Sequence, residues 1–187
     1  MIYLCFFLLH RNRAGMFVAN HNSWMDIPFI GITVGWRNYK LISKAELGKV
    51  PILGRSIKVG GHVMVDRSSR RSQLQTFKSG IKCLNDGIHL CAFPEGTRSK
   101  TGRLLPFKNG AFKMASKTGS PIIPFSIVAS GKAHPANWMF PRRHCAGLCK
   151  VVVHDPIETE GKTDQELSEL VREAIIDGLP EDQHPLD

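Results

Sequence analysis

His21 and Asp26 are the pair of residues in this sequence best suited to acid–base chemistry. Histidine takes up a proton near neutral pH, and a neighbouring carboxylate can fix its tautomer and stabilise the imidazolium that forms. On one helix the two positions would lie about 140° apart, so we expect His21 on a turn after a strand and a helix that begins near Ser23. The spacing from Ser23 to Asp26 also fits a capping box, in which the carboxylate only ties down the helix start. The sequence alone leaves both interpretations open.

Residues 93–99, which read Phe-Pro-Glu-Gly-Thr-Arg-Ser, form a candidate anion site. They follow an apolar run, and a glycine-containing turn at the carboxyl end of a strand is where α/β proteins usually place ligands. Gly96 allows the backbone to come close to a ligand, and Arg98 offers a planar fork suited to a phosphate. A solvated basic loop is the alternative. The pattern Gly-x4-Gly-Lys-Ser/Thr is missing from the sequence, which argues against nucleotide hydrolysis.

A second basic group follows the apolar run that ends at Val65. Arg67 is a candidate for another wall of the same anion pocket or for a surface that faces acidic headgroups. The alternative is a local ion pair between Asp66 and Arg67, which would contribute little to stability. We expect no specific role for Arg70 and Arg71, because exposed charges usually face water.

The charge of the chain is unevenly distributed. Residues 1–154 carry 23 Lys and Arg against 5 Asp and Glu, whereas residues 155–187 carry 2 against 11. A body this basic favours anionic partners, namely nucleic acid, an acidic membrane surface or phosphorylated small molecules. The charge is accompanied by no recognisable nucleic-acid-binding motif, so we expect no nucleic-acid partner.

The cysteines favour a reducing compartment. There are five, an odd number, and the sequence has no secretory signal, which favours free thiols over a disulfide framework. Cys145 and Cys149 lie beside His144, but no second ligand pair follows at zinc-finger spacing, so we expect no metal. Cys91 lies inside an apolar run and is expected to be a buried small hydrophobe.

The alternation of short β-rich runs with helical patterns predicts a single α/β domain, with a central mostly parallel or mixed sheet flanked by helices. Strands are expected at residues 16–19, 39–42, 62–65, 88–93, 122–128 and 149–154. Helices are expected from Leu74 to a stop at Asp86-Gly87, over residues 108–117, and after a capping box at Thr163. The inner face of that last helix is predicted to carry Leu167, Leu170, Val171, Ala174 and Ile175.

The domain is expected to cover residues 16–180, followed by an acidic tail at residues 181–187 that frays. Residues 1–15 form a short or truncated segment with an apolar run and a basic end. The apolar run, residues 1–9, is too short for a membrane-spanning helix, which needs about 20 residues. A buried strand, an interfacial anchor and the remnant of a longer membrane segment are all open, and we favour the remnant.

Four ordered blocks resemble the glycerolipid acyltransferase family, and within it the 1-acylglycerol-3-phosphate (lysophosphatidic acid) acyltransferases of plastids and bacteria. The blocks are Asn20-His21-x4-Asp26, Gly61-x3-Val65-Asp66-Arg67, residues 93–99 and Pro121-Ile122-Ile123-Pro124. The resemblance covers roughly residues 16–155. It departs from the family at the start, since members usually carry an N-terminal membrane helix or helical hairpin before the first block.

The resemblance implies transfer of an acyl group from acyl-coenzyme A or acyl carrier protein to the free sn-2 hydroxyl of 1-acylglycerol 3-phosphate. It implies that His21 is the general base, that Asp26 orients it, and that neither a metal nor another cofactor takes part. The implied substrate-binding residues are Arg67, Glu95, Gly96, Thr97, Arg98 and Lys108. Among these, Arg98 would hold the acceptor phosphate.

The resemblance also implies a lysophospholipid acceptor and association with a membrane surface, that of the plastid envelope, the endoplasmic reticulum or the bacterial inner membrane. The active site would lie on the reducing side. Two alternatives stay open: an acyltransferase that uses glycerol 3-phosphate or another lysophospholipid, and a catalytically silent membrane-binding relative.

Overall fold

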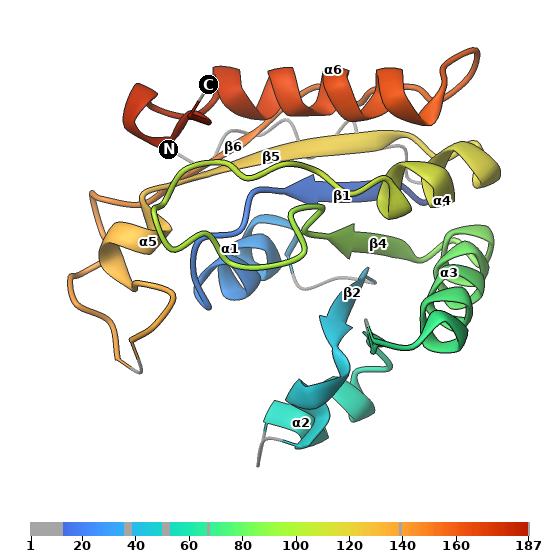
Figure 1. The fold of residues 1–187 in the computed structure, drawn as a ribbon, viewed down its shortest axis with the longest axis horizontal. Helices are drawn as coiled ribbons and strands as arrows, with labels where there is room; N and C mark the ends of the chain where they lie inside the picture. Colours follow the sequence, from blue (N-terminus) through green and yellow to red (C-terminus); the bar gives the residue numbers. More distant parts are fainter. Residues whose placement is uncertain (1–12, 36–38, 50–52, 67, 139, 187) are drawn as a thin grey trace.

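Six strands form one mixed sheet in the order β3-β2-β4-β1-β5-β6 (Figure 1). The computed structural model describes residues 13–35, 39–49, 53–66, 68–138 and 140–186. The strands are β1 (Met16–Ala19), β2 (Tyr39–Lys44), β3 (Val63–Val65), β4 (His89–Ala92), β5 (Ile122–Val128) and β6 (Lys150–Val153). The first five run parallel and β6 runs antiparallel to β5. The predicted fold class is therefore confirmed.

All six predicted strands are present. The bounds of β1 and β5 agree with the prediction to the residue. Strand β3 begins one residue later than predicted, and β4 and β6 are each one residue shorter at both ends. Strand β2 continues two residues beyond the predicted end, to Lys44, because Ser43 and Lys44 still pair with β3. The two central strands are β4 and β1, and Val18 of β1 lies between Ala92 of β4 and Pro124 of β5.

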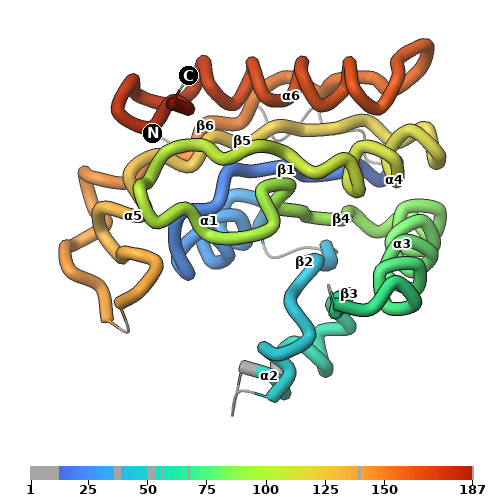
Figure 2. Tube along the Cα trace, viewed as in Figure 1, coloured from blue at the N-terminus to red at the C-terminus, as the bar shows by residue number. Residues whose placement is uncertain are grey.

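Helices α1 to α5 lie between the strands along the chain and α6 follows β6, as the tube in Figure 2 shows. They are α1 (Asp26–Thr33), α2 (Leu53–Val59), α3 (Arg70–Asn85), α4 (Gly110–Thr118), α5 (Ser130–Ala133) and α6 (Asp164–Asp177), with 3-10 turns η2 (Ala45–Lys49) and η3 (Glu181–Gln183). Their ends follow local sequence signals. Gly87 and Gly119, with φ of 78° and 62°, follow the ends of α3 and α4, and both hydrogen bonds of the capping box between Thr163 and Glu166 open α6.

The two faces of the sheet are covered by different helices. Successive residues of a strand point to opposite faces. Met16 and Val18 pack in one core with α3, α4 and α6, whereas Phe17 and Ala19 pack in a second core with α1. The chain therefore leaves β1 toward one face and β4 toward the other. Such a divergence opens a crevice at the carboxyl ends of the two strands, which is the usual ligand site of an open α/β sheet.

Four expectations are wrong. Helix α4 begins at Gly110 rather than Lys108, because the N–H of Lys108 donates to the backbone oxygen of Pro94 at 2.9 Å. Helix α1 begins at Asp26 rather than near Ser23, because the Asp26 carboxylate accepts the N–H groups of Asn22 and Ser23 and holds them in an open turn. Leu170 of α6 is 39% exposed, since the buried stripe runs through Leu167, Val171 and Ile175. The tail does not fray at Glu181: it forms η3, in which Gln183 is buried.

The predictions for residues 1–9 lie outside the described residues. Within the described part of the chain, none of the helices is long and apolar enough to cross a bilayer.

Candidate active site

His21 and Asp26 meet at the carboxyl edge of the sheet, one just after β1 and the other at the first residue of α1. His21 Nδ1 lies 2.8 Å from Asp26 Oδ2, and the Asp26 side chain is fully buried. A carboxylate oxygen only accepts, so Nδ1 is the donor in this contact, and in the neutral ring the lone pair is on Nε2. The same Oδ2 accepts the N–H groups of Asn22 at 2.7 Å and Ser23 at 2.8 Å. Asp26 therefore does both things that its spacing suggested: it orients His21 and it ties down the turn.

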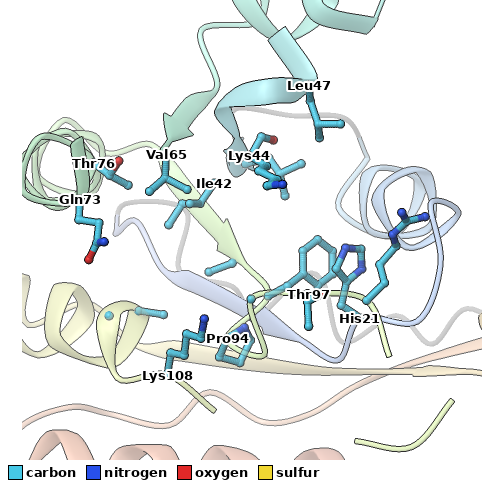
Figure 3. Close-up of a pocket in the computed structure, with 18 of the residues that line it drawn as sticks. His21, Ile42, Lys44, Leu47, Val65, Gln73, Thr76, Pro94, Thr97 and Lys108 are labelled. Carbon is cyan, nitrogen blue, oxygen red and sulfur yellow. The ribbon is translucent and has the colours of Figure 1, made fainter. Parts of the chain in front are cut away.

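The His21 ring is held on its face as well as at Nδ1. It stacks on the ring of Phe93, which follows β4, with 4.0 Å between the ring centroids and 16° between the planes. The side chain stays 16% exposed and lines the main pocket of the molecule (Figure 3). Because Nδ1 is engaged with Asp26, Nε2 is the nitrogen left to exchange a proton with a bound molecule.

Glu95 joins the loop after β1 to the loop after β4. Its Oε1 accepts the backbone N–H of His21 at 2.6 Å, and its Oε2 accepts that of Leu105 at 3.0 Å. The side chain is buried and is not part of the pocket wall. Burial raises the pKa of Glu95 to about 8, although the two N–H groups act in the opposite direction. These contacts give Glu95 a supporting role beneath His21, in a place different from the acceptor contact implied by the resemblance.

Residues far along the chain hold the same loop. Gln183 accepts the N–H of Leu104 with its backbone oxygen at 2.9 Å, and the N–H of Ala129 with its Oε1 at 2.8 Å. Arg172 Nη1 donates to the backbone oxygen of Leu105 at 2.9 Å. Thus α6 and η3 hold the backbone at Leu104 and Leu105, and Glu95 accepts the N–H of Leu105. Sequence reasoning missed Arg172 and Gln183, since no local pattern marks either.

Arg98 supplies the free donor of the site. Its guanidinium lies over the Trp24 ring at 4.4 Å from the centroid, a cation–π geometry. Its Nη1 is buried and has no hydrogen-bond partner among the described residues. Burial lowers the pKa of Arg98, and the Asp26 charge acts in the opposite direction. A buried donor without a partner costs free energy, and an anionic ligand would remove that cost.

The other predicted binding residues fall into three groups. Gly96, Thr97 and Lys108 line the pocket with Arg98. Gly96 has φ of 74°, and a Cβ there would lie 3.0 Å from Lys108 Nζ, so the glycine allows the lysine to cross its backbone. Glu95 lies behind the wall, as described above. Arg67 lies outside the described residues.

The pocket has a volume of about 790 Å³. From His21 it extends toward β2, β3 and α3, where Ile42, Val65 and Thr76 lie (Figure 3). Phe77 and Met114 add apolar surface, and Lys44 adds a second positive charge. The volume falls in the range of small-molecule sites, which combine apolar walls with a few polar groups. The apolar wall comes from separate elements, and for that reason the linear sequence did not reveal it.

The cysteines are unpaired where the structure describes them, and Cys91 is fully buried, as predicted. Burial also raises the pKa of its thiol. Within the described ranges no three side chains of His, Cys, Asp or Glu gather as a metal ion would require.

The chain matches known acyltransferases. The sequence model of the family described as Acyltransferase matches residues 8–128. A chloroplastic 1-acyl-sn-glycerol-3-phosphate acyltransferase of Brassica napus is 38% identical over 142 residues, which cover 76% of this chain and 40% of the relative. A 1-acyl-sn-glycerol-3-phosphate acyltransferase of Saccharomyces cerevisiae is 34% identical over 171 residues, which cover 88% of this chain and 55% of the relative. The chain thus spans about half the length of the curated relatives it matches.

A solved structure gives the same result. The crystal structure of a 1-acyl-sn-glycerophosphate acyltransferase from Thermotoga maritima matches with a TM-score of 0.76 and 31% identity, over 90% of this chain and 66% of that one. The resemblance read from the four sequence blocks is therefore confirmed at the level of the family and the fold. On this evidence the chain belongs to the acyltransferase family.

Proposed function

We propose that the chain transfers an acyl group from a thioester donor to the sn-2 hydroxyl of 1-acylglycerol 3-phosphate, giving phosphatidic acid. One observation carries the proposal: His21, whose Nδ1 lies 2.8 Å from Asp26 Oδ2, and Arg98, whose Nη1 has no hydrogen-bond partner among the described residues, line the same pocket. A base, its orienting carboxylate and an anion-binding donor are what a phosphorylated alcohol needs to attack an activated acyl group. The names of these relatives support this choice of acceptor.

In the proposed reaction His21 Nε2 takes the proton of the hydroxyl as its oxygen attacks the thioester carbonyl. The new carbon–oxygen bond forms, the carbon–sulfur bond breaks, and the imidazolium returns the proton to the leaving thiolate. The Asp26 charge stabilises the imidazolium between these two steps. We propose no metal and no acyl-enzyme, because the thioester is already activated and the task is to make the alcohol nucleophilic.

We propose that the charged part of the pocket wall binds the acceptor phosphate and that the apolar part binds an acyl chain. Arg98 and Lys108 provide positive charge for the acceptor phosphate. The apolar wall formed with Ile42, Val65 and Phe77 suits an acyl chain. Both substrates carry long apolar chains, so we propose that the reaction takes place at a membrane surface with the site on the reducing side. The chloroplastic relatives favour a plastid membrane.

Thiol release by the purified full chain tests this proposal. Acyl-coenzyme A and acyl carrier protein are compared as donors, with lysophosphatidic acid, glycerol 3-phosphate and lysophosphatidylcholine as acceptors in detergent. We expect release that depends on lysophosphatidic acid, with phosphatidic acid identified by mass spectrometry. Release with another acceptor alone would transfer the proposal to that acceptor. Vesicle binding without release under any combination would favour the silent relative.

Arg98→Ala should raise the KM for lysophosphatidic acid about 10- to 100-fold, because a charge-assisted hydrogen bond is worth about 1.5–3 kcal/mol. The KM for the donor should stay unchanged in steady-state measurements that vary one substrate at a time. Arg98→Lys is the matched control, because it keeps the charge but loses the planar guanidinium and its stacking on Trp24. Its KM for lysophosphatidic acid should lie between those of the unmodified chain and Arg98→Ala. A change confined to the donor KM would move Arg98 to the donor subsite.

A further inference from the structure

Two exposed aromatic side chains and two exposed arginines extend from the carboxyl edge of the sheet. The chain that joins β5 to β6 leaves the sheet at the same edge as His21, because β5 runs parallel to β1 (Figure 1). In this connection Trp138 is 48% exposed and Phe140 is 71% exposed. Arg142 and Arg143 are also exposed. We name these four residues the aromatic–basic patch.

The patch is held in place by its own backbone. His134 is buried, and its Nε2 lies 3.0 Å from the backbone oxygen of Trp138. The N–H groups of Arg142 and Arg143 both donate to the backbone oxygen of Ala133, at 2.7 and 3.1 Å. These contacts tie the backbone at Trp138, Arg142 and Arg143 to the segment that follows β5. A surface that is ordered before binding loses little conformational entropy when a partner covers it.

The composition of the patch fits the headgroup region of a bilayer. The Arg142 guanidinium lies over the Trp138 ring at 5.3 Å from the centroid. Tryptophan favours the membrane interface, where one part of the ring is apolar and another is hydrated, and arginine binds lipid phosphates. Among the described residues no carboxylate forms an ion pair with Arg142 or Arg143. Their charge is thus available to an anionic surface.

We propose that the aromatic–basic patch docks the chain on an anionic bilayer and turns the carboxyl edge of the sheet, with the entrance to the site, toward the lipid. Phe140 and Trp138 enter the interface, and Arg142 and Arg143 contact the phosphates. Docking by the patch involves no chemical step, so it is independent of the reaction proposed above. The patch also lies beyond residue 128, where the match to the family model ends.

The apolar half of the proposal is tested by co-sedimentation of the full chain with phosphatidylcholine vesicles that contain phosphatidic acid. Phe140→Ser should raise the lipid concentration for half-maximal binding about tenfold, as expected for an apolar ring removed from an interface. Leu170→Ser is the matched control, because Leu170 is an exposed apolar residue on α6, and it should bind as the unmodified chain does. Equal weakening in both variants, or none in Phe140→Ser, would overturn the proposal.

The basic half is tested with two charge-matched double variants. Arg142→Glu/Arg143→Glu should abolish the preference for vesicles with phosphatidic acid over vesicles of phosphatidylcholine alone. Lys113→Glu/Lys117→Glu changes the net charge equally on the exposed face of α4 and should retain the preference. Equal loss in both double variants would mean that overall charge suffices, and would overturn the role of the patch.

A conservative variant and a fold measurement complete the test. Trp138→Phe should bind vesicles nearly as well as the unmodified chain, since an aromatic ring remains, and circular dichroism should be the same for all variants. Binding of the patch to single-stranded RNA in place of vesicles would overturn the proposal and assign the patch to nucleic acid. A chain that binds vesicles through the patch but transfers no acyl group would refute the proposed reaction and leave this inference standing.

Discussion

Replacing His21 with alanine should lower turnover by about 10²- to 10⁴-fold, the range that a general base contributes. The imidazole is the group in the pocket with a free lone pair beside a buried carboxylate, so nothing else described there replaces it. The backbone of His21 stays tied to Glu95 and Ser99 through its own N–H and oxygen. The loss should therefore appear in kcat for thiol release and leave the thermal unfolding midpoint nearly unchanged.

His144→Ala provides the control, since His144 is an exposed histidine of the same chain. It should retain full activity in the same assay. A folded His21→Ala protein with near-normal turnover would show that the base assignment is wrong. A protein that loses both activity and its unfolding transition would be replaced by His21→Gln, which keeps a polar side chain of similar size.

Asp26→Asn should lower turnover by about 10²-fold with only a modest loss of stability. The hydrogen bonds of this side chain all reach Oδ2, from His21, Asn22 and Ser23, while Oδ1 is buried without a partner among the described residues. An amide can place its oxygen at the Oδ2 position and keep all three bonds. It then removes the charge that stabilises the imidazolium and puts an unpaired NH2 group at Oδ1, which costs about 1–3 kcal/mol.

Asp26→Ala separates the two roles of the carboxylate. It removes the charge and also the acceptor that ties down the turn of Asn22 and Ser23, so its unfolding free energy should fall further than that of Asp26→Asn. Both quantities are measured side by side, turnover by thiol release and stability by urea unfolding. Full turnover in a stable Asp26→Asn protein would mean that the carboxylate acts as a cap alone.

Local signals in the sequence predicted the parts of the fold that short segments determine. Strands β1 and β5 were predicted to the residue because each is an apolar run with clear breakers at its ends, such as Pro121 before β5. The capping box predicted the start of α6. Leu170 was misplaced because helical spacing predicts a wide apolar stripe, whereas α6 buries the narrower stripe through Leu167, Val171 and Ile175.

The sequence predicted those residues of the candidate site that lie close together in the chain or in a recognisable turn. It did not predict the contacts between residues that lie far apart in the chain. His21 and Asp26 are five residues apart, and Arg98 follows a recognisable turn. The support beneath them depends on long-range pairs: Glu95 with His21, and Gln183 with the loop after β4. The acidic composition of the last residues predicted a frayed tail. That prediction was wrong because composition does not show that the Gln183 side-chain oxygen accepts the N–H of Ala129.

The contacts of Gln183 have a consequence for the stage of synthesis at which the proposed site can assemble. The residues proposed for chemistry, from His21 to Lys108, are translated first, whereas the residue that joins the loops after β4 and β5 is translated near the end of this sequence. A nascent chain can therefore carry every recognisable motif while the backbone beneath Glu95 still lacks its support. We therefore expect the proposed active arrangement to be complete only after α6 and η3 have left the ribosome and docked.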